Sequence, residues 1–148
     1  MSDKSSLLTV FNPILSIQGF NCSIAENKEI LIEEWKKQFS FGKTLRREPL
    51  WHSFSFNRYS NLSKKLAIKK FENTYLKNVI IFSDFKFLPI KCEAESASIL
   101  NFELIKNCLN KIPNQIDLYI CHKNFNWTFV ITHEQDYGPY FATLTKTI

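Results

Sequence analysis

The stretch IDLYICHKNFNWTFVITHEQDYGPYF, residues 116–141, carries the strongest fold signal in the chain. Its Val, Ile, Phe, Tyr, Trp and Thr residues fall into two runs around a short polar segment, which is typical of a β-hairpin. In both runs, at 116–121 and 127–132, apolar residues recur at every second position. Gly138–Pro139 then turns the chain toward a further predicted strand over 140–145.

Three helices are predicted upstream of this hairpin. The first begins at Ser23 and Glu26, which fit a capping box, and Gly42 ends it. The second runs from residue 60 or 61 to about 75, and the third from residue 96 or 98 to 111. Apolar side chains recur along one face of each segment, as an amphipathic helix requires.

Two short strands are predicted between the second and third helices, Asn78–Phe82 (NVIIF) and Phe85–Ile90 (FKFLPI). Pro89 favours an edge position for the latter, because proline cannot donate to a sheet ladder. Residues 1–22, which a proline interrupts, are assigned to an N-terminal arm or edge segment. Residues 23–148 are predicted to form a single α+β domain, with about three helices packed on a mostly antiparallel four- to five-stranded sheet.

The composition fits one domain with a large core. Of the 148 residues, 45% are hydrophobic and 15% are aromatic, so neither disulfides nor a cofactor are needed to stabilise a core, and no cofactor is expected. The 3 glycines cannot supply the GxGxxG or GxxxxGK[ST] loops that cradle phosphates. Nucleotide binding by those routes is excluded.

Cysteine usage and hydropathy predict a cytoplasmic protein. The 4 cysteines are widely spaced without a CxxC pair, which favours free, mostly buried thiols in a reducing compartment. The N-terminal residues lack the pattern of a signal peptide, and no apolar run approaches the ~20 residues of a membrane-spanning helix. We therefore expect a soluble protein with no membrane partner.

The formal net charge of +5 raises the question of a nucleic-acid partner, since basic residues gather at 36–47 and 64–70. The chain is also rich in Asn, Ile, Phe and Lys and poor in Gly and Ala, the bias of an AT-rich genome. Lysine pairs on a helix usually form a solvated face. Nucleic-acid binding is therefore not the expected function.

The histidines His52, His122 and His133 are candidate metal ligands. The segment HEQDY at 133–137 lacks the second histidine of an HExxH zinc motif and follows a strand instead of lying on a helix. His122 is expected beside the hairpin loop, away from His133. We therefore assign no metal site.

General acid–base chemistry is a further hypothesis for the hairpin end, where His133 and Glu134 precede Asp136 and Tyr137. Neighbouring strand residues point to opposite faces, so His133 and Glu134 cooperate only if the backbone turns there. The structural alternative is that one of the two closes the hairpin by bonding to loop backbone.

Nucleophilic cysteine catalysis has weaker support. Cys121 and His122 are neighbours on a predicted strand and cannot form a nucleophile–base pair. Cys92 is expected in a polar loop, where exposure would make it reactive. No catalytic residue is assigned.

A second dense segment, LRREPLWHSFSFNRY at 45–59, mixes aromatic and basic residues. Aromatic residues and arginine dominate interaction hot spots, and they also stack on single-stranded nucleic acid. Core packing is the simpler explanation for Trp51. Some of His52, Arg58 and Tyr59 are expected to face outward, where they would line a partner-binding groove.

Four segments carry a resemblance to a known family: LWHSFSF at 50–56, AIKKF at 67–71, NVIIF at 78–82 and the whole hairpin at 116–141. Over about residues 25–141 the chain resembles a small uncharacterised bacterial family, domain of unknown function 4275. The resemblance implies no known reaction. The positions that match the family's pattern are Trp51, His52, Trp127, His133, Glu134 and Tyr140.

The sequence thus predicts a bacterial cytoplasmic protein without enzymatic activity that binds another protein, with immunity to a toxin as one concrete version. The alternative is a small enzyme or ligand-binding protein that uses His133, Glu134 and His52 in a pocket beside the hairpin. The candidate binding residues are Trp51, His52, Arg58, Tyr59, Trp127, His133, Glu134, Asp136, Tyr137 and Tyr140.

Overall fold

The computed structural model describes residues 6–25, 27–40, 50–55, 59–83, 87–112, 115–134 and 137–144. Within them lie the helices α1 Ser6–Ile17, α2 Lys28–Phe39, α3 His52–Ser55, α4 Lys64–Glu72 and α5 Phe102–Asn110. The strands are β1 Phe20–Ile24, β2 Leu62–Ser63, β3 Leu76–Phe82, β4 Ile90–Ser98, β5 Leu118–His122, β6 Trp127–Ile131 and β7 Tyr140–Thr143.

All seven strands belong to one sheet with the order β1-β4-β3-β5-β6-β7-β2, and each neighbouring pair is antiparallel. The predicted α+β class and antiparallel sheet are confirmed. The expected three helices and four to five strands were too few, since the described residues form 5 helices and 7 strands. None of the described helices combines the length and apolarity needed to cross a membrane.

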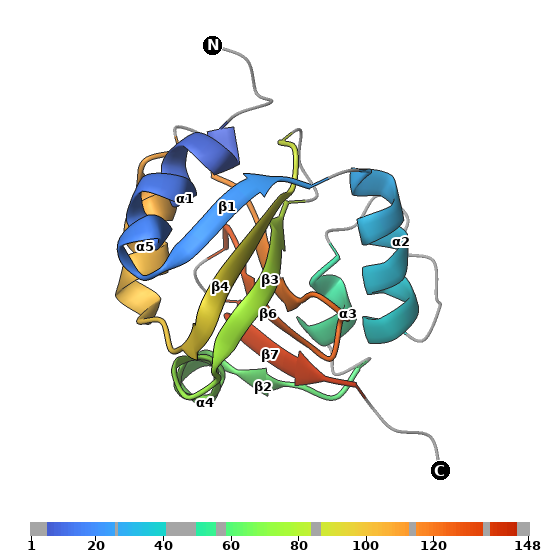
Figure 1. Cartoon of the computed structure of the whole chain (residues 1–148). Helices are drawn as coiled ribbons and strands as arrows, with labels where there is room; N and C mark the ends of the chain where they lie inside the picture. Colours follow the sequence, from blue (N-terminus) through green and yellow to red (C-terminus); the bar gives the residue numbers. More distant parts are fainter. Residues whose placement is uncertain are drawn as a thin grey trace.

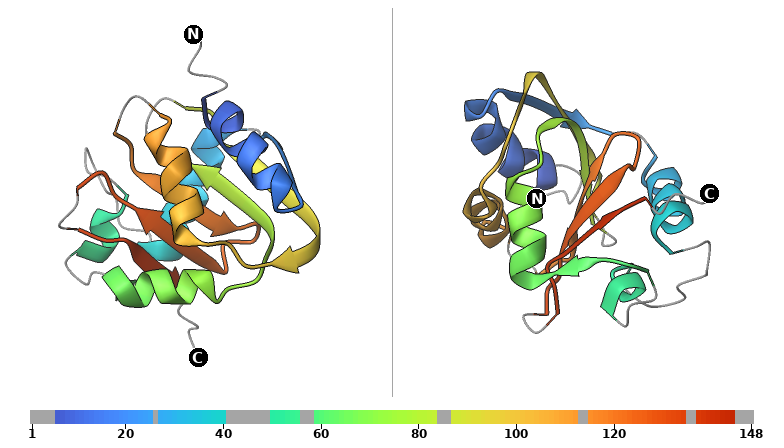
Figure 2. Two further views of the ribbon diagram at one scale, coloured as in Figure 1. Left: turned by 90° about the vertical axis from the view of Figure 1, so that its left-hand side faces the viewer. Right: turned by 90° about the horizontal axis from the view of Figure 1, so that it is seen from below.

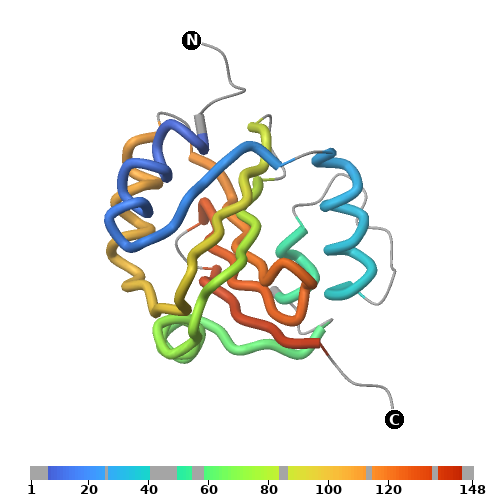
Figure 3. The backbone as a smooth tube through the Cα atoms, in the orientation of Figure 1, coloured from blue at the N-terminus to red at the C-terminus, as the bar shows by residue number. Residues whose placement is uncertain are grey.

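Helices cover both faces of the sheet (Figure 1). Figure 2 shows α1, α4 and α5 on one face and α2 with α3 on the other. The tube in Figure 3 follows the twist of the sheet between these two layers. A central strand is therefore buried on two sides, and its alternating side chains enter two different cores.

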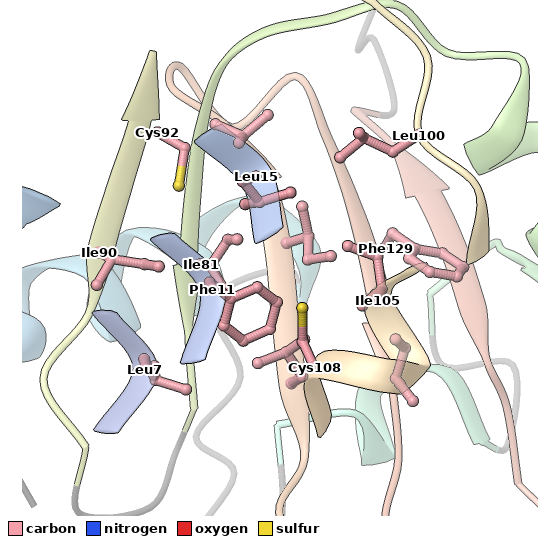
Figure 4. Close-up of a cluster of buried hydrophobic side chains, with 14 of the residues drawn as sticks. Leu7, Phe11, Leu15, Ile81, Ile90, Cys92, Leu100, Ile105, Cys108 and Phe129 are labelled. Carbon is pink, nitrogen blue, oxygen red and sulfur yellow. The ribbon is translucent and has the colours of Figure 1, made fainter. Parts of the chain in front are cut away.

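The first core lies under α1, α4 and α5. Figure 4 shows Leu7, Phe11 and Leu15 of α1 pointing into it, together with side chains of β3, β4, β6 and α5. The strands contribute alternate residues, such as Leu118 and Ile120 of β5. This periodicity explains why the hairpin pattern was recognisable in the sequence.

The second core lies under α2 and α3 and takes the other residues of the same strands, including Tyr119 and Val130. Trp35 of α2 is fully buried there, and its indole N–H donates a hydrogen bond to Oγ1 of Thr128 at 3.0 Å. The polar Thr128 is thus satisfied within an aromatic core, as a buried hydroxyl requires.

The N-terminal segment forms a helix followed by an edge strand. Leu7, Phe11 and Leu15 recur every four residues and are buried, which gives α1 one apolar face despite Pro13 within it. The sequence interpretation took the proline as an interruption and missed this helix. Burial of the apolar face outweighs the cost of the internal proline.

The predicted capping box at the start of α2 is wrong. Ser23 lies in β1, and the N-cap is Asn27, which has φ 58° and makes no side-chain capping bond. Sheet pairing of Cys22 and its neighbours with β4 overrides the local helix signal. Glu26 and Gly42 lie outside the described residues.

The region around Pro89 also differs from the prediction. Strand β4 begins only at Ile90, after the proline, and continues to Ser98 between β1 and β3, so it is not an edge strand. Its exposed polar residues resembled a helix start in the sequence. The helix α5 instead starts after Asn101, whose side chain accepts a hydrogen bond from the Glu103 N–H at 2.8 Å.

The packing of Phe129 in the first core predicts how much its removal lowers the free energy of unfolding. Phe129 is fully buried and stacks on Phe71 at a centroid distance of 4.2 Å. We expect Phe129→Ala to lower the free energy of unfolding by about 3–5 kcal/mol, measured by urea denaturation. The control Tyr75→Ala, at a residue that is 72% exposed, should change it by less than about 0.5 kcal/mol. Equal effects of the two substitutions would contradict this packing.

Candidate functional site

The candidate site lies where the β5–β6 hairpin opens, at the end opposite its tip. The antiparallel register pairs Leu118 with Ile131 at this end. Asp117 directly precedes β5 and His133 follows β6, so the ladder itself brings the two side chains together. Sequence reasoning missed Asp117; the signal that identifies it is a lone carboxylate at the start of an otherwise apolar strand.

Asp117 and His133 form the central polar contact. Oδ1 of Asp117 lies 2.7 Å from Nδ1 of the His133 ring and also accepts the His133 backbone N–H at 2.7 Å. Asp117 is only 7% exposed, whereas the His133 side chain is 36% exposed. One buried carboxylate oxygen therefore fixes both the backbone and the ring of a surface histidine.

Glu134 faces the other nitrogen of the same ring. Its Oε1 lies 3.6 Å from Nε2 of His133, and its side chain is 48% exposed. The backbone turns after β6, which removes the obstacle that adjacent strand residues face in opposite directions. The turn is closed by the Thr132 hydroxyl, whose oxygen lies within hydrogen-bond distance of the carbonyl oxygens of Glu134, at 2.7 Å, and Tyr137; its single proton is donated to one of the two.

Trp51, just before α3, packs against the residues at this end of the hairpin. The ring centroid of Trp51 lies 4.5 Å from that of His52, 5.5 Å from that of Tyr137 and 6.5 Å from that of His133. Tyr140 of β7 stacks on the same indole at 6.3 Å. Edge-to-face and stacked geometries of this kind stabilise aromatic groups beyond the area they bury.

Trp51 is itself only 1% exposed, and its indole N–H has no hydrogen-bond partner among the residues that the structure describes. The Trp51 backbone N–H is satisfied, because it donates to the Tyr119 hydroxyl at 3.1 Å. An unpaired buried donor costs about 1–3 kcal/mol. A buried donor that bears this cost is usually kept because its side chain packs well or serves a function.

Six of the candidate residues lie together with Asp117, and we call this group the Trp51–His133 cluster: Trp51, His52, Asp117, His133, Glu134, Tyr137 and Tyr140. Burial raises the pKa of Tyr140, and the neighbouring Tyr137 adds to the shift. The Tyr140 phenol is therefore neutral at physiological pH and acts in the cluster as a packing group with a polar end.

The structure places two other candidates elsewhere. Tyr59 is buried in the second core, where its hydroxyl donates to the Thr143 carbonyl at 3.0 Å. Trp127 lies on the opposite face of the sheet and stacks on Phe141 at 5.6 Å. Arg58 and Asp136 lie outside the described residues. The expectation that Tyr59 helps to line an outward-facing groove is therefore corrected.

The candidate metal ligands and reactive cysteines lie in or beside several separate elements of the described parts of the chain. No group of three His, Cys, Asp or Glu side chains there is placed to hold a metal ion. His122 lies at the hairpin tip, where its Nδ1 accepts the Asn124 N–H at 3.0 Å. Cys121 is buried beside Thr128, and burial raises its pKa to about 12. Cys92 lies in β4 and is fully buried, not in the polar loop that was expected.

In a comparison with protein families, the model of Domain of unknown function (DUF4275) matches residues 21–141. The chain belongs to this family, and the resemblance seen in the sequence is confirmed. The matched region contains the whole Trp51–His133 cluster, and all of α1 lies outside it. Comparison with curated proteins and with solved structures gives no match.

The contact between Asp117 and His133 predicts a graded response to substitution. Asp117→Ala removes the carboxylate oxygen that contacts the backbone N–H and Nδ1 of His133, and it should lower the free energy of unfolding by about 1–3 kcal/mol. Asp117→Asn keeps an oxygen in the place of Oδ1 and should cost clearly less. Chemical denaturation measures both.

His122→Ala, at the opposite end of the hairpin, is the matched control and should have little effect. Equal losses for Asp117→Asn and Asp117→Ala would show that the negative charge matters more than the accepting oxygen.

Proposed function

We propose that the protein is a non-enzymatic protein-binding module whose partner docks on the exposed part of the Trp51–His133 cluster. The supporting observation is the arrangement of His133, Glu134 and Tyr137 over one buried indole at a hairpin end. The side chains at this surface are 36% (His133), 48% (Glu134) and 40% (Tyr137) exposed. These side chains are exposed enough to contact a partner, and neighbouring residues restrict their positions.

Rigid aromatic and charged groups favour binding because little conformational entropy is lost when they are covered. Asp117 and Trp51 restrict the His133 ring, and Thr132 ties the turn that carries Glu134 and Tyr137. A tyrosine beside a fixed histidine and carboxylate offers both apolar area and directed hydrogen bonds. These are features of residues that dominate binding energy in protein interfaces.

Cavities along α2, beside β3 and beside β4 lie away from the Trp51–His133 cluster, which favours a docking surface there over a small-molecule pocket. A cavity of about 450 Å³ is lined by Lys91, Glu93 and Lys123, at the tip end of the β5–β6 hairpin. His133 is at the other end of that hairpin. The size of this cavity is within the range of ligand sites, yet the Trp51–His133 cluster does not line it.

We propose further that the protein acts in the bacterial cytoplasm, with immunity to a toxin as one version of protein binding. The support is indirect: all 4 cysteines are free and buried, as in proteins of reducing compartments. Small single-domain α+β proteins rich in aromatic residues commonly have such a role, which is an argument by analogy.

A second candidate function, acid–base chemistry on a small substrate, is favoured by one observation. A carboxylate that binds Nδ1 of a histidine fixes the ring orientation and leaves Nε2 for proton transfer, as the Asp117–His133 contact does. Glu134 is 3.6 Å from that Nε2 and is the second titratable group within reach. This hypothesis requires that a substrate displaces or joins Glu134 at the surface.

The binding proposal predicts that Tyr137→Ala weakens partner binding while the fold is kept. The tagged full-length protein would be used to capture partners from a lysate of its source cells, and each candidate would be purified and titrated by calorimetry. We expect Tyr137→Ala to lower the affinity at least about tenfold, since an interface tyrosine contributes about 1–2 kcal/mol or more.

Tyr75→Ala is the matched control, because Tyr75 is also an exposed tyrosine but lies beyond the end of α4, outside the Trp51–His133 cluster. Unchanged affinity of Tyr137→Ala, or an equal loss with Tyr75→Ala, would contradict docking at this cluster.

The acid–base hypothesis predicts turnover of a small substrate that depends on the imidazole. A panel of ester, amide and phosphoester substrates would be screened with the wild-type protein and with His133→Gln. Hydrolysis lost in His133→Gln but kept in His122→Gln would favour the enzyme over the binding module. Turnover that both variants retain would assign the activity to another site.

A further inference from the structure

Two cysteines face each other across the edge of the sheet. Cys22 of β1 and Cys92 of β4 are direct register partners, and both belong to the first core. The thiols are free in the structure. Register partners of adjacent strands lie on the same face of the sheet, so the two side chains are neighbours on its inner surface.

The type of pairing decides how close the two thiols come. In an antiparallel ladder, opposite residues alternate between hydrogen-bonded pairs and closer, non-hydrogen-bonded pairs. One position beyond the end of β1, the Ala25 N–H donates to the Pro89 carbonyl at 2.8 Å, which marks a hydrogen-bonded position in this register. Going back along β1 from Ala25, the Ile24 pair is then non-hydrogen-bonded and the Ser23 pair is hydrogen-bonded. The next pair, Cys22 with Cys92, is therefore non-hydrogen-bonded.

A second observation agrees with this assignment. The Cys22 N–H donates to Oδ1 of Asn12 in α1 at 3.3 Å, so it points away from β4. The backbone groups of Cys22 therefore do not bond to Cys92. In such a pair the Cα atoms are about 4.5 Å apart, which lies within the range of about 4.4–6.8 Å that a disulfide spans.

We infer that Cys22 and Cys92 are a latent dithiol which a peroxide oxidises to an intramolecular disulfide, joining the edge strand β1 to β4. Strand β1 is held by the sheet on one side only, since it is the first strand in the order. It is therefore the strand whose position a covalent bond to β4 would change most. Helix α1 packs on β1 and would be held with it.

The chemistry balances with peroxide as the only co-reactant. The Cys22 sulfur, as thiolate, attacks one peroxide oxygen, and cleavage of the O–O bond leaves a sulfenic acid and, after protonation, water. The Cys92 sulfur then attacks the sulfenic sulfur; its proton and the departing hydroxide form a second water. Two thiols thus lose two electrons and two protons, and the peroxide takes them up.

The two thiols differ in a way that fits these roles. Cys22 is 7% exposed and Cys92 is fully buried, so peroxide reaches Cys22 first. Hydrogen bonding with the Cys92 thiol lowers the pKa of Cys22. The same interaction, together with burial, raises the pKa of Cys92. Because peroxide reaches Cys22 first, Cys22 is the attacking thiol and Cys92 is the resolving thiol.

The test treats the native full-length wild-type protein with hydrogen peroxide, blocks the remaining thiols by alkylation in denaturant and maps the peptides by mass spectrometry. We expect linked peptides containing Cys22 and Cys92, with the mass of two hydrogens lost, and Cys108 and Cys121 alkylated. The midpoint of thermal unfolding should rise by several degrees and return when dithiothreitol is added.

Cys22→Ala and Cys92→Ala should each abolish the linked peptide and the thermal shift. Cys121→Ala is the matched control, because Cys121 is equally buried but faces the second core, and it should leave both intact. The wild-type peptide map does not depend on how the variants fold. A disulfide from Cys22 to Cys108, sulfinic acid at Cys22 with Cys92 still alkylated, or no reaction would each overturn the inference.

Discussion

Strands β5 and β6 lie in the middle of the sheet, and burial on both of their faces is the constraint on which the rest of the structure depends. One set of alternating side chains, which includes Phe129, packs under α1, α4 and α5. The other set, which includes Tyr119, packs under α2 and α3. A strand that closes two cores at once has a strongly specified register, because a slip by one residue would exchange its two faces.

The candidate site is a consequence of that register. Asp117 precedes β5 and His133 follows β6, just beyond the last register pair of the hairpin, Leu118–Ile131. The strand pairing therefore brings the two side chains together. Trp51 comes from a segment far away in the sequence. Its position is fixed by the hydrogen bond from its backbone N–H to the hydroxyl of Tyr119, a residue of the second core. The geometry of the polar surface is therefore tied to the packing of the second core beneath it.

The edge of the same sheet behaves differently. Strand β1 has one strand neighbour, and Asn12 satisfies an N–H on its open side. Covering an edge with a side chain from a helix is one way in which proteins prevent unwanted strand pairing. The Cys22–Cys92 pair lies at this edge strand and not in the doubly buried centre, so oxidation would act at the border of the sheet.

Periodic segments of the sequence predicted their structure well. The strand at 78–82 and the two hairpin strands were found because alternation of apolar residues is a local signal that tertiary packing reinforces. The capping pattern at Ser23 and the break expected at Pro13 were misleading, since strand pairing with β4 and burial of Leu7, Phe11 and Leu15 contribute more free energy than either local preference. Among the site residues, the aromatic and histidine candidates were recognisable by type, whereas Trp127 and Tyr59 could not be distinguished from them before their sheet face was known.

The sequence by itself determined the α+β class, the central hairpin and the family of this protein, because each depends on patterns within short segments. Only the tertiary structure decided that Asp117 holds His133, that Trp51 lies beneath them and that Cys22 faces Cys92. These pairs join residues distant in sequence, and their contacts depend on register and on the packing of helices over both sheet faces. No local pattern of residues specifies either of these.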